Sequence, residues 1–129
     1  MKRIEPERLR PPPRERFAPD TLAFDLELAF QRLAEESHEG VDGHRQITLF
    51  KGGSFTVVAF LFDADGTFPR HQADGIVTLH LLDGHLDVHT NTGRFALGEH
   101  GLLVLQPQVP FSVHADRESR MVMTVHLNQ

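Results

Sequence analysis

Three histidines within sixteen residues, His71, His80 and His85 in the segment HQADGIVTLHLLDGHL, are the side chains best suited to chemistry. Imidazole nitrogen is a common ligand of zinc and iron, and a protein metal site needs three or four ligands that converge. The chain contains no cysteine, which excludes thiolate ligands, thiolate nucleophiles and disulfides. Whether these histidines meet depends on the elements that carry them.

Other groups in the chain give weaker evidence of chemistry. The DADGT segment at 63–67 lacks the further oxygen ligands and the closing glutamate of a calcium loop, and it indicates a turn. Ser54 and Ser112 lack the glycine-flanked setting of a serine nucleophile. Glu99 and His100 are neighbours in a predicted turn, where polar side chains are usually solvated.

The pattern of apolar residues predicts one helix followed by short strands. Residues 20–37 carry apolar side chains at helical spacing, with Asp20 and Asp25 as alternative N-caps. From residue 46 onward, nine short runs of β-type residues alternate with turn residues, which predicts an all-β sandwich or barrel. We therefore expect three parts: an extended N-terminal tail at 1–19, a helix and linker at 20–45, and a β-barrel at 46–129.

Length and charge narrow the class of protein. The chain has 129 residues, enough for one domain, and a net charge of −5. Residues 1–16 carry six basic and three acidic side chains, so the acidic excess lies in the remainder. An acidic body argues against nucleic acid or a membrane as the partner. No run approaches the ~18 apolar residues that span a bilayer, and no secretory signal is present, so we expect a cytoplasmic protein.

Residues 66–114 resemble the cupin superfamily of small jelly-roll barrels. The first cupin motif, G-x5-H-x-H-x3-4-E-x6-G, overlays His71, Ala73, Val77 and Gly84, with Gly66 one residue off the spacing of its first glycine. The second motif, G-x5-P-x-G-x2-H, overlays HGLLVLQPQVPF, with Phe111 in place of its histidine. The resemblance implies an all-β fold, a cupin-type double-stranded β-helix (jelly-roll) barrel, here with one N-terminal α-helix.

The resemblance also implies where a metal would bind, and the residues there differ. Metal-binding cupins use two histidines and a glutamate from the first motif and a histidine from the second. Here these positions hold His71, Ala73, Val77 and Phe111. Three of them offer no lone pair, so we expect no metal cofactor and no stoichiometric transition metal. The alternative is a divalent ion such as zinc, manganese or iron, held by His71 with His80 or His114.

Strand parity opposes that alternative site. Successive residues of a strand face opposite sides of the sheet. If Val77 and Phe111 point into the barrel, as the ligands they replace would, then His80 and His114 point outward. One further strand carries polar residues on its outer face, which we expect to be solvated: His85, Asp87 and His89.

The remaining candidate site is an apolar pocket with one polar group. It combines His71 with a lining of Val77, Leu79, Phe111 and Val113. Such a cavity suits a small, mostly apolar ligand, unless the side chains simply fill the barrel. The leading hypothesis is a metal-free cupin-like protein without catalysis of its own, which binds a small molecule or serves as a sensing or accessory module. Alternatives are a metal-dependent oxygenase or isomerase that uses His71, and a structural or interaction dimer with a filled barrel.

The resemblance also implies a homodimer paired through the barrel sheets. The run SFTVVAFLF is apolar on both faces, so its outer face needs cover from the helix or from a second subunit. If the helix packs on the barrel, Phe30→Ala should destabilise the fold. The tail before Phe17 should be removable without loss of stability.

Overall fold

The computed structural model describes residues 20–36 and 40–128, and they form one helix and nine strands. The predicted tail at 1–19 lies outside these residues. The elements are α1 (Leu26–Ala34), β1 (His44–Gly52), β2 (Phe55–Phe62), β3 (Thr67–His71), β4 (Gly75–Asp83), β5 (Leu86–Thr90), β6 (Gly93–Leu97), β7 (Leu102–Leu105), β8 (Phe111–Ala115) and β9 (Ser119–Leu127). Within this part of the chain, no helix is long and apolar enough to cross a membrane.

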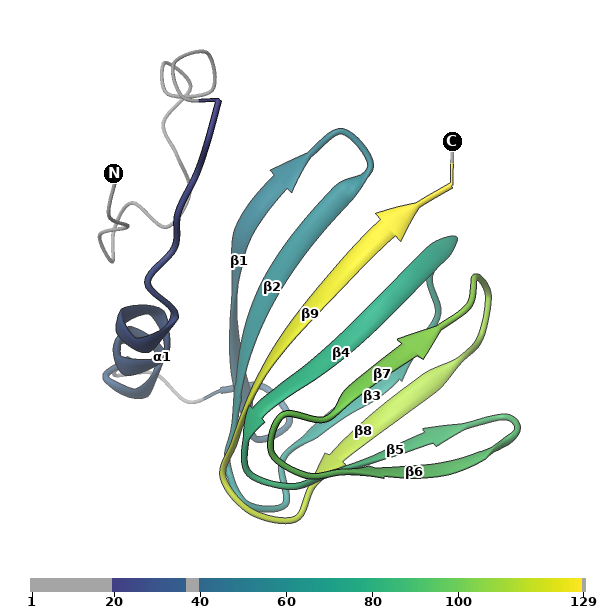
Figure 1. The fold of residues 1–129 in the computed structure, drawn as a ribbon. Coiled ribbons are helices and arrows are strands. Elements are labelled where there is room, and N and C mark those ends of the chain that lie inside the picture. The colour runs from purple at the N-terminus through teal and green to yellow at the C-terminus, as the bar shows by residue number, and fades with distance from the viewer. Residues whose placement is uncertain (1–19, 37–39, 129) are drawn as a thin grey trace.

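The strands form two antiparallel sheets that face each other (Figure 1). The larger sheet has the order β1-β2-β9-β4-β7 and the smaller one the order β3-β8-β5-β6. Strands distant in sequence are neighbours, because β9 pairs with β2 and β4 while β8 pairs with β3 and β5. The predicted all-β jelly-roll class with one helix is confirmed.

Helix α1 is shorter than the apolar pattern predicts. It covers Leu26–Ala34 rather than 20–37, and Asp25 is its N-cap. The Leu28 backbone N–H donates a hydrogen bond to the Asp25 side chain at 3.0 Å. This bond satisfies one of the free N–H groups of the first turn and fixes where the helix begins. Of the two predicted caps, Asp25 is correct and Asp20 lies outside the helix.

The helix packs on the outer face of the larger sheet, beside β1 and β2 (Figure 1). Its buried residues are Ala29, Phe30 and Leu33. Ala59 and Leu61 of β2 are buried in the same cluster, whereas the alternate residues of β2 point into the barrel. Strand β2 is apolar on both faces because it lies between these two cores. The helix of the same chain therefore provides the cover that SFTVVAFLF requires.

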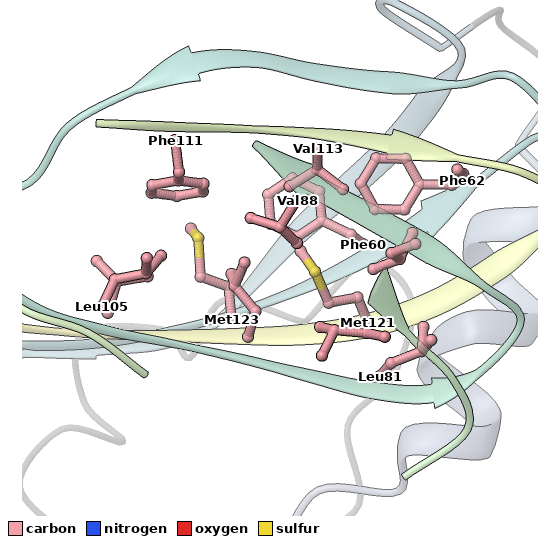
Figure 2. Close-up of a cluster of buried hydrophobic side chains, with 14 of the residues drawn as sticks. Phe60, Phe62, Leu81, Val88, Leu105, Phe111, Val113, Met121 and Met123 are labelled. Atoms are coloured by element: carbon pink, nitrogen blue, oxygen red, sulfur yellow. The ribbon is translucent and has the colours of Figure 1, made fainter. Parts of the chain in front are cut away.

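The main core lies between the two sheets and is built from both (Figure 2). Leucine and valine are its most numerous side chains, phenylalanine and methionine fill the space between them, and the rings of Phe60 and Phe62 stack with centroids 5.8 Å apart. The labelled members of this core come from six strands and point toward one another: Phe60, Phe62, Leu81, Val88, Leu105, Phe111, Val113, Met121 and Met123. Each such buried side chain contributes roughly 1.5–3 kcal/mol to folding.

Candidate functional site

The predicted pocket residues, apart from His71, lie inside the packed core. Val77, Leu79, Phe111 and Val113 are each at most 2% exposed. A cavity large enough for water would leave accessible area on the side chains around it. The interior is therefore filled at these four residues. Binding of a small apolar molecule here stays a prediction, and it would require the core to open.

His71 lies at the end of β3, at the edge of this core. Its ring centroid is 5.3 Å from that of Phe68 and 5.7 Å from that of Phe111, its register partner on β8. Ala73 packs against the same core, and Val77 is within it. The side chains at these positions do not fit a divalent ion, because three of the four present only carbon.

The other two histidines of the alternative site lie on the outer faces of different sheets. His80 is half-buried on β4, in the larger sheet, between two fully buried neighbours. His114 is on β8, in the smaller sheet. Its Nε2 is 3.3 Å from Asp65 Oδ1, and its Nδ1 is 3.3 Å from Asp116 Oδ1. Both side chains have the outward direction that strand parity predicted.

A different cluster of titratable side chains lies on the outer face of the smaller sheet. His85 directly precedes β5, Asp87 is on β5, and Asp116 directly follows β8. One ligand-type atom from each of these three residues lies within 4.8 Å of the other two. His85 Nδ1 and Asp116 Oδ2 are only 2.5 Å apart, so the imidazole N–H donates a hydrogen bond to the carboxylate.

Asp87 is the buried member of this cluster. The expectation that it would be solvated was wrong, because it is only 6% exposed. Its Oδ2 is 3.4 Å from a guanidinium nitrogen of Arg94, while its Oδ1 accepts no hydrogen bond from residues 20–36 or 40–128. A buried carboxylate oxygen without a partner costs free energy that a bound cation or a donor would otherwise recover.

The groups around Asp116 lower the pKa of its carboxyl. Desolvation by burial raises the pKa of this carboxyl, but the hydrogen bond and positive charge of His85 outweigh it. The positive charge of His114 adds to the lowering. The net pKa of Asp116 therefore lies below its ordinary value of 3.8, and the carboxylate is ionised at neutral pH.

Backbone contacts hold the two turns that carry the cluster. The Asp116 N–H donates to the His85 carbonyl at 3.0 Å, and the His85 N–H donates to Ser119 Oγ at 3.0 Å. Ser119 is fully buried. Gly84 has φ +107°, and a Cβ there would be 2.1 Å from Ser119 Oγ, so the close approach of the turns requires glycine. His85 and Asp116 are thereby fixed relative to each other.

Sequence reasoning placed His85 and Asp87 on one strand face but did not connect them with Asp116. The sequence contains one local indication of a buried polar site, an acidic residue between two apolar strand positions that follows a DG turn at 83–84. The third member comes close only because β5 pairs with β8, where Asp87 is opposite His114. Pairing of strands so distant in sequence is not visible in local patterns.

One hollow of about 460 Å³ lies beside the start of β1 and β3. Its lining includes Glu36, Asp42 and Arg45, beside Phe68. Arg45 Nε is 3.8 Å from Glu36 Oε1 within this lining. This charged surface hollow differs from the apolar pocket that the sequence predicted around His71.

Comparisons with known proteins identify the fold. No family model and no curated protein matches the chain. Several solved structures match the chain. A cupin superfamily protein from Desulfitobacterium hafniense is similar with a TM-score of 0.65 and 12% identity, over 72% of this chain and 84% of that one. The chain has a cupin fold. The cupin architecture implied by residues 66–114 is therefore confirmed, with identities low enough that the likeness concerns fold alone.

Two further structures with similar folds differ in what is known of them. A conserved protein of unknown function from Streptococcus pyogenes is 16% identical, with a TM-score of 0.66, and the match covers 100% of this cupin-fold chain and 97% of that one. Salicylate 1,2-dioxygenase from Pseudoaminobacter salicylatoxidans is 17% identical with a TM-score of 0.71, over 94% of this chain but only 41% of the enzyme. Cupin-fold neighbours thus include an enzyme and a protein without an assigned role.

Proposed function

We propose that this protein is a cupin-fold interaction module that forms a homodimer and performs no metal-dependent catalysis inside its barrel. The packed interior carries the proposal. Phe111 and Val77 stand where metal-binding cupins place a histidine and the glutamate, and both are at most 2% exposed. Metal-dependent oxygenase or isomerase chemistry in the barrel would need metal ligands and space for substrate beside the metal.

An exposed apolar surface supports the homodimer. Ile76 of β4 and Leu102 and Val104 of β7 are between 40% and 61% exposed on the outer face of the larger sheet. This face lies beyond the part that α1 covers (Figure 1). Contiguous apolar side chains of this kind favour an interface, and a two-fold axis would let one such face cover its copy.

Light scattering on the full chain tests the association. We expect a mass of about twice the 14.6 kDa of one chain at micromolar concentration, with or without a chelator. A mass of one chain would contradict the interaction role.

Assays of oxygenase and isomerase substrates test the other half of the proposal. We expect no turnover that a chelator abolishes and that iron, manganese or zinc restores. Turnover that depends on metal and is lost in His71→Ala would establish the enzyme alternative instead.

A further inference from the structure

The outer cluster of His85, Asp87 and Asp116 contains one buried carboxylate, that of Asp87, which its protein partners satisfy only in part. Arg94 is the cation beside Asp87, at 3.4 Å, and its side chain is 66% exposed. His85 bonds to Asp116 rather than to Asp87. One oxygen of Asp87 therefore stays buried, ionisable and without a hydrogen-bond donor from the described residues. Burying such a group is costly unless a cation completes the site.

We propose that His85, Asp87 and Asp116 bind one divalent transition metal ion of the zinc class on the outer face of the smaller sheet. Imidazole nitrogen and carboxylate oxygen are both zinc ligands, and three protein ligands leave the fourth tetrahedral position for water. The three ligand-type atoms already lie within 4.8 Å of one another. The site is separate from the barrel positions of the cupin motifs, and it does not depend on the proposed homodimer.

Ligand type selects the ion. Calcium and magnesium prefer six or more oxygen ligands, whereas imidazole favours zinc and its neighbours in the transition series. His114 adds a second imidazole beside the group, since its Nδ1 is 3.3 Å from Asp116 Oδ1.

The two turns hold the ligands in place before any ion arrives. The backbone bond from Asp116 to His85 and the bond from His85 to Ser119 Oγ fix two of the ligand residues. Asp87 is fixed by its place in β5, between β6 and β8. Ligands supported on rigid elements lose little entropy on binding, which favours affinity. The ion would join the β4–β5 turn to the end of β8.

Calorimetric titration of the full chain with zinc chloride, after removal of metal by a chelator, tests the site. We expect one equivalent of zinc per chain, and a dissociation constant that rises at least ~10-fold in Asp87→Asn and in His85→Ala. His89→Ala is the matched control, because His89 lies on the same strand and outer face but outside the group. His71→Ala controls for the barrel position. Both controls should bind zinc as the original protein does.

Thermal melting gives a second measurement that does not require strong heat signals. Zinc should raise the melting temperature of the original protein and of His89→Ala, but not that of Asp87→Asn. Without metal, Asp87→Asn should melt no lower than the original, because the substitution removes a buried charge. If that variant does not fold, Asp116→Asn, at a more exposed position, serves in its place.

Three results would overturn the inference. The first is a metal-free protein that binds no zinc at micromolar concentration. The second is zinc binding that His85→Ala and Asp87→Asn leave unchanged, which would indicate adventitious binding at other histidines. The third is binding lost in His71→Ala, which would place the ion in the barrel. Calcium and magnesium at the same concentrations should give no binding heat.

Discussion

Phe111 makes the centre of the barrel an apolar packed core. Its ring occupies the place where the second cupin motif has a histidine, and it is 1% exposed among the core side chains (Figure 2). It contacts the rings of Phe68 and His71 as well, with centroids 6.1 and 5.7 Å away. An aromatic ring in this position fills volume and donates nothing to a metal.

Phe111→Ala should therefore lower the free energy of unfolding by roughly 3–5 kcal/mol, because it removes a fully buried ring and leaves a cavity. Urea unfolding measures the change. Phe95→Ala is the control, since Phe95 is 40% exposed and should cost clearly less. Equal effects of the two substitutions would show that the barrel interior is not tightly packed.

Ionisation of Asp116 makes the stability of the fold depend on pH in the acidic range. Its folded-state pKa is lower than the ordinary 3.8 of an unfolded chain, so its contribution is fully present above that value and is lost as the pH falls through the folded pKa. In metal-free protein, the difference in melting temperature between the original and Asp116→Asn should shrink between about pH 5 and pH 2. A difference that is constant over this range would contradict the lowered pKa.

At the scale of elements, α1 and β9 are joined by one side chain. Arg120 of β9 donates from Nε to Asp83 Oδ2 at 2.7 Å, and its Nη1 is 3.7 Å from Glu27 Oε1 on the helix. Its guanidinium carbon lies 5.4 Å from the centre of the Phe30 ring. Arg120 therefore covers the buried helix face with its charged head and links the helix to the larger sheet.

Phe30→Ala tests how much this docking contributes. Phe30 is 2% exposed, so the substitution should lower the free energy of unfolding by roughly 3–5 kcal/mol. Gln31→Ala, on the exposed side of the same helix, should change it by less than about 0.5 kcal/mol. Denaturant unfolding measures both. A loss below about half a kcal/mol in Phe30→Ala would mean that the helix is not docked in solution.

At the scale of the whole molecule, the larger sheet has two different outer regions. Helix α1 covers the β1–β2 side, and the β4–β7 side presents Leu102 and Val104 to solvent at 61% and 54% exposure. An edge strand such as β7 also has unpaired backbone groups, which invite association unless they are covered. We infer that the proposed homodimer uses the β4–β7 side.

The double substitution Leu102→Asp with Val104→Asp should convert the proposed dimer to a monomer, because it places four charges across a two-fold interface. The control is Val41→Asp, at another exposed apolar position that is 72% exposed and not on this face. Light scattering should give half the original mass for the first variant and the original mass for the control. An unchanged mass in both would exclude this face as the interface.

The sequence by itself determined the type and order of the elements. Alternation of apolar and polar residues predicts strands that bury one face, so nine runs became nine strands of the described chain. The loss of metal ligands from the cupin motifs was also local information, because Ala73, Val77 and Phe111 cannot coordinate an ion in any fold. The sequence offered two aspartates as N-caps of the helix. The structure shows that the helix begins after Asp25, whose side chain accepts a hydrogen bond from the Leu28 N–H.

Only the tertiary structure decided what lies next to what. Packing of Phe60, Phe111 and Met123 from three strands filled the barrel, and residue volumes in sequence do not reveal whether facing side chains meet. The same holds for Asp87. Strand parity placed it outward, but pairing of β5 with β8 set His114 opposite it and brought Asp116 near, and Asp87 is only 6% exposed there. Contacts between residues about thirty positions apart depend on sheet topology, which long-range pairing sets and local pattern does not.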